Sequence, residues 1–201
     1  MENNTEPEQA LTSQESLDLI SRMIIKARRD YYDTGLSSLL WGGTITFCSL
    51  VSFANYYLQW SALDFVWFLT FAAVIVQGMI SAREKKHRRL KGHDEDLMSG
   101  IWISFAIAVF LLSLVMPLLK LPYSPSLYMV IYGIPTFTTG YARRFRPMII
   151  GGLACWVFSI LAVFTPFPYV ILYLAASAQL AWFIPGIILR KRYLKAGKKN
   201  V

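Results

Sequence analysis

Six long apolar runs divide this chain, and they constrain its fold more than any other feature. Each run is close to the roughly 20 residues that a helix needs to cross a hydrocarbon core about 30 Å thick. Charged residues make up only 16% of the chain, and they gather between the runs. The sequence therefore predicts an all-α polytopic membrane protein, a six-helix transmembrane bundle over residues 37–189. The predicted segments are 37–58, 63–82, 100–119, 125–142, 147–164 and 169–189.

The distribution of Lys and Arg predicts the orientation of this bundle. If both termini are cytoplasmic, 19 of the 20 basic residues lie on the cytoplasmic side, and only Lys120 lies outside. The inverted orientation places those 19 on the wrong side of the membrane. We therefore expect a multi-pass protein of the bacterial cytoplasmic (inner) membrane with a cytoplasmic N-terminus and C-terminus. The same bias explains the net charge of +8, so we expect no nucleic-acid partner.

The residues on either side of the bundle predict separate cytoplasmic elements. Residues 1–11 are polar and acidic, which is typical of a disordered tail and unlike the basic start of a signal peptide. Residues 12–34 open with a capping box, Thr12 to Glu15, and predict an amphipathic helix. Its apolar stripe can dock on the protein, lie on the membrane surface or bind a partner helix. The stripe consists of Leu17, Ile20, Ile24, Ala27 and Tyr31. Residues 190–201 predict a basic cytoplasmic tail.

The membrane segments lack the residues that membrane enzymes use. No Asp, Glu, Lys, Arg or His lies in the middle of a predicted segment, and intramembrane ionisable groups are the usual mark of catalysis, proton relays and ion paths. Cys48 and Cys155 lie within apolar runs, where a free cysteine behaves as a small hydrophobic residue. We therefore expect that the protein is not an enzyme and has no catalytic residue, metal site or cofactor.

One predicted cytoplasmic loop, residues 83–98, is basic in its first half and acidic in its second. His93, Asp94 and Asp96 offer metal-ligating groups, but metal ligands need a fixed geometry and supporting hydrogen bonds. A loop with this many charges is more typical of a solvated connector. We expect its basic half to attract anionic lipid headgroups at the cytoplasmic face.

Two predicted segments contain an interior proline, Pro135 in the fourth and Pro185 in the sixth. Proline removes a backbone hydrogen bond that lipid cannot replace, and paired broken helices indicate a transporter site. In the alternative interpretation both prolines are tolerated kinks, and amides such as Gln77 and Gln179 form hydrogen bonds between helices. The candidate ligand or cavity contacts are Pro135, Thr136, Thr139 and Gln179.

Glycines near the start of the three outward-running segments leave two interpretations open. They are Gly42 with Gly43, Gly100, and Gly151 with Gly152. The pattern fits three related hairpins, and a 3+3 inverted repeat is also compatible with six segments. In the second interpretation, the glycines are small residues that let neighbouring helices approach closely.

Parts of the sequence resemble a family of small uncharacterised bacterial six-helix integral membrane proteins with an N-terminal amphipathic helix. The resemblance lies in residues 17–24, in Gly35 with residues 40–42, in residues 147–152 and in residues 181–186. It covers most of the chain and implies a sensing or accessory role, but the family has no assigned activity, so no functional residue carries over. We therefore predict a non-enzymatic accessory or sensor protein of the cytoplasmic membrane. The alternative is a small-solute transporter with its site at the fourth and sixth segments.

Overall fold

The computed structural model describes residues 14, 17–18, 34–87, 93–119 and 125–198. The chain divides into two units, Met1–Tyr32 and Asp33–Val201. In the first unit Leu17 is helical, and its side chain is 65% exposed. The predicted tail of residues 1–11 and the other members of the apolar stripe lie outside the described residues. Those parts of the sequence analysis therefore stay predictions.

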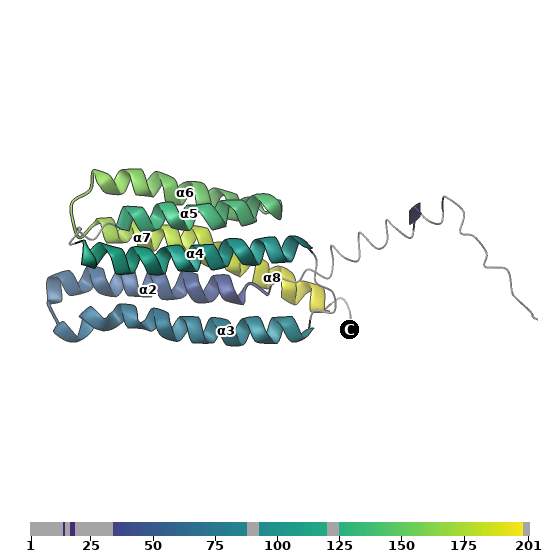
Figure 1. The fold of residues 1–201 in the computed structure, drawn as a ribbon, viewed down its shortest axis with the longest axis horizontal. Helices are drawn as coiled ribbons and strands as arrows, with labels where there is room; N and C mark the ends of the chain where they lie inside the picture. Colours follow the sequence, from purple (N-terminus) through teal and green to yellow (C-terminus); the bar gives the residue numbers. More distant parts are fainter. Residues whose placement is uncertain (1–13, 15–16, 19–33, 88–92, 120–124, 199–201) are drawn as a thin grey trace, which may run out of the picture. The chain divides into compact units, whose positions relative to one another are not determined.

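The second unit is a bundle of helices that run alongside one another (Figure 1), and its described residues contain no strand. Two of its elements are not α-helices: η1 is a 3₁₀-helix and η2 is a π-helix. The elements are α2 (Leu36–Leu58), η1 (Ser61–Phe68), α3 (Leu69–His87), α4 (His93–Leu118), α5 (Pro125–Ala142), α6 (Arg146–Val163), α7 (Val170–Ala178), η2 (Gln179–Phe183) and α8 (Ile184–Lys198). The last three follow one another without a gap.

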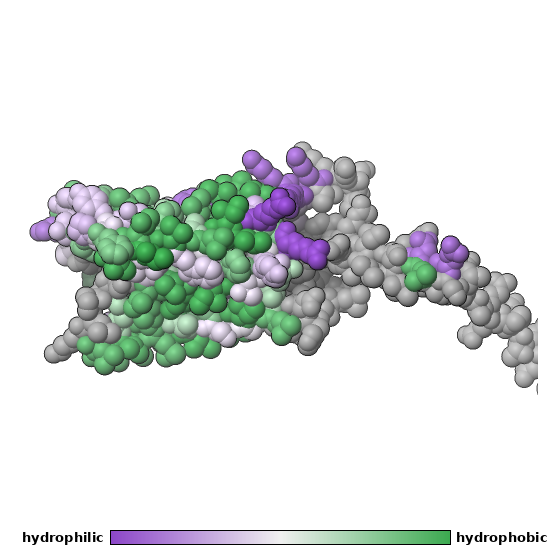
Figure 2. Space-filling view, turned by 90° about the horizontal axis from the view of Figure 1, so that it is seen from above, coloured by the Kyte–Doolittle hydropathy of each residue, from purple (hydrophilic) through white to green (hydrophobic). Residues whose placement is uncertain are grey.

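Burial separates the inner helices of the bundle from the peripheral ones. Half of the apolar window in Val170–Lys195 is buried, whereas the windows in α3 and α4 are only 6% buried. α2 packs against α3 and α7, α5 pairs with α6, and α4 contacts α5. Apolar side chains cover the flank of the bundle, and the most hydrophilic residues gather toward one end (Figure 2). This distribution is the one expected of helices whose outer faces meet lipid.

Five helices are long and apolar enough to cross a membrane. They are Leu36–Leu58, Phe65–Glu84, Leu97–Leu118, Arg146–Val163 and Val170–Lys195. The fourth predicted segment forms α5, which has 18 residues but is not among the five. Its threonines, tyrosines, glycines and prolines lower its hydropathy, and eight of its residues are buried. The described chain therefore has the helices of a multi-pass membrane protein, and the count of six spans stays a prediction.

Helices extend further than predicted at the charged ends of the segments. α3 continues to His87 and α4 begins at His93, so much of the predicted loop 83–98 is helical. α8 continues to Lys198, through most of the predicted tail 190–201. Lys, Arg and Glu are good helix formers, so a helix that begins in an apolar run can continue into a charged one. Hydropathy alone does not reveal such an extension.

The second predicted segment begins with η1 instead of an α-helix, and η1 is tied to α2 by side chains. The indole N–H of Trp67 donates to Ser52 Oγ at 2.9 Å, and the thiol of Cys48 donates to the carbonyl of Val66 at 3.5 Å. Both bonds join two segments, so the periodicity of either segment alone could not predict them.

Close helix contacts explain Gly42 of α2 and the two glycines of α6. A Cβ atom on Gly42 would lie 2.6 Å from the backbone nitrogen of Phe183, and one on Gly151 would lie 2.4 Å from the carbonyl oxygen of Leu180. A Cβ atom on Gly100 would meet no atom within 4 Å. The three positions are therefore not equivalent, and close approach explains the glycines better than three related hairpins do.

Candidate functional site

The four predicted ligand contacts lie in α5 and at the start of η2. Pro135, Thr136 and Thr139 are buried, and Gln179 is half-buried. The structure brings α5 and η2 into contact, as the prediction requires. Neither of the two pockets described below includes any of these four residues.

α5 runs through Pro135 as a continuous helix. The threonine hydroxyls around the proline bond to carbonyls of the preceding turn: Thr136 donates to the carbonyl of Tyr132 at 2.8 Å, and Thr138 to that of Ile134 at 2.7 Å. Such bonds back to the previous turn are how Ser and Thr are accommodated inside helices. The hydroxyl groups of these two threonines are therefore already used by the protein.

Trp182 of η2 joins the polar group of α5 to an aromatic cluster. Its indole N–H donates to Thr136 Oγ1 at 2.9 Å. Its ring lies 4.8 Å from that of Tyr132, 6.0 Å from that of Phe105 and 6.4 Å from that of Trp102, measured between ring centroids. Offset and edge-on aromatic pairs at these separations stabilise a core by more than their buried area alone would give. Trp182 thus packs against the peripheral helix α4, which carries Trp102 and Phe105. α4 also contacts α5 through the ring pair of Phe105 and Tyr132.

The two interior amides form hydrogen bonds between helices. Gln179 Nε2 donates to Thr46 Oγ1 of α2 at 3.0 Å, and Gln77 Nε2 donates to Ser37 Oγ of α2 at 2.9 Å. Bonds of this kind stabilise helix pairs in membranes. The interpretation of these amides as links between helices is confirmed.

The π-turn of η2 explains how the last helix accommodates Pro185. The N–H of Ile184 bonds to the carbonyl of Gln179, five residues earlier. Proline has no N–H, and its ring presses on the carbonyl four residues before it. A turn widened to i−5 bonding relieves that pressure, so the helix widens before Pro185 and continues beyond it.

Four buried side-chain atoms have no hydrogen-bond partner among the described residues. They are Ser49 Oγ, Gln77 Oε1, Thr139 Oγ1 and Ser177 Oγ. A buried polar atom without a partner generally costs about 1–3 kcal/mol. Thr139 is therefore the one predicted ligand contact whose hydroxyl group the protein does not use.

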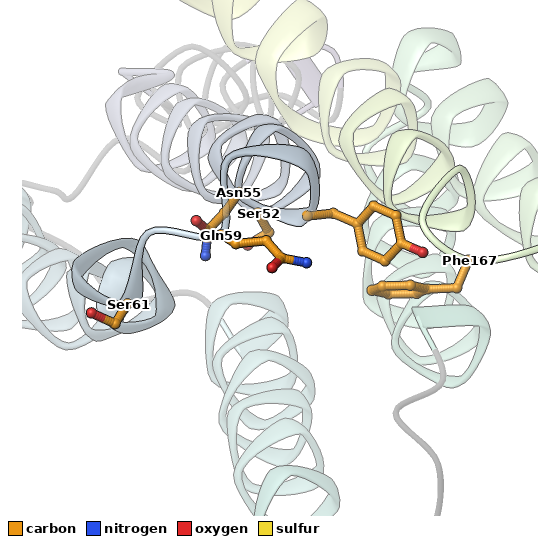
Figure 3. Close-up of a pocket in the computed structure, with 6 residues that line it drawn as sticks. Ser52, Asn55, Gln59, Ser61 and Phe167 are labelled. Atoms are coloured by element: carbon orange, nitrogen blue, oxygen red, sulfur yellow. The ribbon is translucent and has the colours of Figure 1, made fainter.

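An open pocket of about 390 Å³ lies where α2 ends (Figure 3). Gln59 has a left-handed backbone, φ 51°, and Asn55 Oδ1 accepts a hydrogen bond from the backbone N–H of Trp60 at 2.9 Å. The ring centroids of Tyr56 and Phe167 lie 5.3 Å apart. The pocket is lined by Ser52, Asn55, Tyr56, Gln59, Ser61 and Phe167.

A second pocket, of about 320 Å³, lies at the opposite end of the bundle and is lined by Tyr141, Arg144, Arg146 and Ile149. Sequence analysis assigned its arginines to topology alone. The signal that it missed is the local charge balance: after Asp96 the chain has ten basic residues and no acidic one.

Metal binding finds no support in the described side chains, which contain no group of three His, Cys, Asp or Glu residues able to hold an ion. The side chains of His93, Asp94 and Asp96 lie outside the described set. Their interpretation as solvated groups stays a prediction.

The fold places the chain in the class of all-helical proteins with several helices apolar enough to span a membrane. Comparison with known proteins narrows this no further, because no family model, curated protein or solved structure matches the chain.

Proposed function

We propose that this chain is a non-enzymatic accessory or sensor protein of the bacterial cytoplasmic membrane, with six spans and both termini in the cytoplasm. The observation that carries the proposal is that polar groups inside the bundle link its helices to one another. Thr136 and Gln179 bond to side chains of other elements, and both prolines lie in continuous helices. A bundle whose interior polar groups hold its helices together leaves its end surfaces for binding.

The pairing of α5 with α6 supports the sixth span. Ser159 Oγ donates to the carbonyl of Ser126 at 2.9 Å near one end of the pair, and Gly140 meets the backbone of Ile149 near the other. α5 therefore follows α6 along nearly its whole length. α6 is apolar enough to cross the membrane, and α5 has the same length of 18 residues. α5 therefore crosses the same thickness of membrane as α6. Its polar residues are tolerated because they face protein.

The proposed partner surfaces are the N-terminal amphipathic helix and the basic cytoplasmic face. A protein partner binds the stripe Leu17, Ile20, Ile24, Ala27 and Tyr31, and the basic half of residues 83–98 attracts anionic lipid headgroups at the cytoplasmic face. The charge pattern places these surfaces on the same side of the membrane, because both carry the Lys and Arg residues that mark cytoplasmic segments.

Removal of the N-terminal helix should abolish partner recovery. We expect the full chain, purified from bacterial membranes in mild detergent, to retain a protein partner that is lost on deletion of residues 12–34. Ile20→Asp with Ile24→Asp should lower the recovery more than about tenfold, because each places an unpaired carboxylate in an apolar contact. Ser21→Asp, outside the stripe, is the control. Equal recovery with and without the helix would remove it as the partner surface.

The transporter alternative predicts a water-filled path beside Thr136, Thr139 and Gln179. The test replaces Cys48 and Cys155 with Ala and introduces Thr136→Cys, Thr139→Cys or Gln179→Cys one at a time. We expect none of the three to react with a water-soluble, membrane-impermeant thiol reagent in sealed cells or in opened membranes, because the two threonines are buried and Gln179 is half-buried at its contact with Thr46. Reaction at two of them, with protection by a solute, would favour the transporter.

The same labelling series tests orientation with two further positions. Ser61→Cys, in the proposed outer loop, should react in sealed cells, whereas Lys195→Cys should react only after the membrane is opened. Both residues are exposed, so orientation alone decides the difference. The opposite pattern would invert the proposed topology.

A further inference from the structure

The turn between α5 and α6 places an arginine in a backbone conformation that favours glycine. The N–H of Phe145 bonds to the carbonyl of Gly140 at 2.8 Å, and the N–H of Arg144 bonds to that of Tyr141 at 3.1 Å. These two bonds define a Schellman motif in which Arg144 is the left-handed residue, with φ 50°. Glycine is the usual residue at that position because it has no Cβ. Arg144 therefore carries a side chain at a position where its backbone conformation is less favourable than that of glycine.

That side chain belongs to a pocket lined by cationic and hydrogen-bonding groups. Arg144 and Arg146 line it together with Tyr141, whose side chain is 71% exposed. The positive end of the α6 dipole adds to their charge, since the first turn of α6 contains no acidic residue and its N-cap, Phe145, makes no side-chain cap bond.

Further positive charge surrounds this pocket. The guanidinium of Arg192, from α8, lies 5.1 Å from the centroid of the Phe145 ring. Burial lowers the pKa of Arg143 to about 10, so that group is still protonated at neutral pH. No Asp or Glu follows Asp96 in the chain. Among the described residues of the bundle, the acidic ones belong to η1, α3 and α4.

The surface of α6 next to this pocket is apolar and faces outward. Ile150 is 63% exposed and Leu153 is 46% exposed, followed by Val157 and Ile160 on the same side of α6. A ligand with a negative headgroup and a long apolar chain would meet the arginines with one part and this row of side chains with the other. A free phosphate ion would use only the arginines.

We propose that the α5–α6 turn is a specific binding site for the headgroup phosphate of an anionic phospholipid, held by Arg144, Arg146 and the Tyr141 hydroxyl, with its acyl chains along Ile150 and Leu153. The site lies at the level where helices leave the hydrocarbon core, which is where lipid phosphates lie. This inference rests on the membrane embedding of the proposed function and not on its accessory role. Failure of the partner experiment would leave it intact.

The test counts lipids on the full-length protein. The protein is reconstituted into phosphatidylcholine vesicles that contain a minor share of phosphatidylglycerol, extracted in mild detergent and examined by native mass spectrometry. We expect phosphatidylglycerol to be retained in preference to phosphatidylcholine. Arg144→Gly and Arg146→Gln should each lower that preference about fivefold, the effect expected of one basic residue at a membrane surface. Lys195→Gln, which removes an exposed charge outside the pocket, should leave it unchanged.

Arg144→Gly also separates binding from folding. Glycine suits the left-handed position, so the variant should unfold at the same temperature as the parent or a higher one while it loses lipid. Inorganic phosphate, added in excess over the lipid, should not displace the bound phosphatidylglycerol. The proposal is overturned if the parent shows no preference, if Lys195→Gln lowers it as much as Arg144→Gly does, or if inorganic phosphate displaces the lipid.

Discussion

Replacement of Gly151 by Ala should destabilise the bundle by roughly 2–3 kcal/mol, the upper part of the range for overpacked cores. The added Cβ would lie 2.4 Å from the carbonyl oxygen of Leu180 and 2.6 Å from the Cα of Ala181. Both are backbone atoms of η2, so no rotamer change can relieve the clash. Gly42→Ala should act similarly from α2, because its Cβ would lie 2.8 Å from the Cα of Phe183. The π-turn is thus held between two glycines.

Two glycines provide matched controls for this prediction. A Cβ on Gly43, the neighbour of Gly42, would approach only one ring atom of Phe183, at 3.9 Å, and a Cβ on Gly100 would meet nothing within 4 Å. Alanine is the better helix former by about 1 kcal/mol, so Gly43→Ala and Gly100→Ala should be neutral or stabilising. Unfolding of the purified variants in detergent, followed by circular dichroism, measures the difference. Equal unfolding midpoints for Gly151→Ala and Gly100→Ala would contradict the close contact between Gly151 and η2.

Trp182→Ala should cost about 3–5 kcal/mol, the usual range for a large aromatic residue removed from a core. The side chain is only 3% exposed, and it contacts Tyr132, Phe105 and Trp102 as well as Thr136. Its loss should also loosen α4, because Trp102 and Phe105 of that helix pack against the Trp182 ring. Increased hydrogen exchange of the α4 backbone, measured by mass spectrometry, would report that loosening.

Variants with smaller changes separate the two contributions of Trp182. Trp182→Phe keeps an aromatic ring but removes the donor to Thr136, so it should cost only about 1 kcal/mol. Trp60→Ala removes an indole that is 65% exposed between α2 and η1, and it should change the free energy of unfolding by less than about 0.5 kcal/mol. If Trp182→Ala lowered the free energy of unfolding no more than Trp60→Ala does, the aromatic cluster would not contribute to attaching α4.

Local sequence patterns predicted the elements well and their contacts poorly. Five of the six apolar segments were confirmed as helices suited to a membrane, because run length and hydropathy are properties of one segment. The amide links of Gln77 and Gln179 were also foreseen, since such groups must bond to something inside a bundle. Their partners, Ser37 and Thr46, could not be named, because the rotation of one helix against another is not encoded in either helix alone.

The candidate residues around the prolines show the same limit. The sequence left two interpretations open for Pro135 and Pro185, a pair of broken helices or two tolerated kinks, because each proline removes a backbone donor. In the fold neither helix breaks: α5 is continuous, and the last helix absorbs Pro185 with a π-turn. Whether a proline interrupts a helix depends on the helices packed around it, and here Gly42 and Gly151 admit the widened turn. Gly42 and Phe183, which meet at this turn, lie more than a hundred residues apart in the chain.

The sequence by itself determined that this protein is all-helical, that several of its helices are suited to a lipid environment, and that its charge is concentrated at a few positions between them. These properties follow from residue composition over windows of about 20 residues, which is the scale set by bilayer thickness. The tertiary structure alone decided which helices are inner and which are peripheral, which glycines meet backbone, and that Arg144 and Arg146 line one pocket. Those outcomes depend on how side chains of distant segments interlock, because close packing is a property of pairs of surfaces and not of single helices.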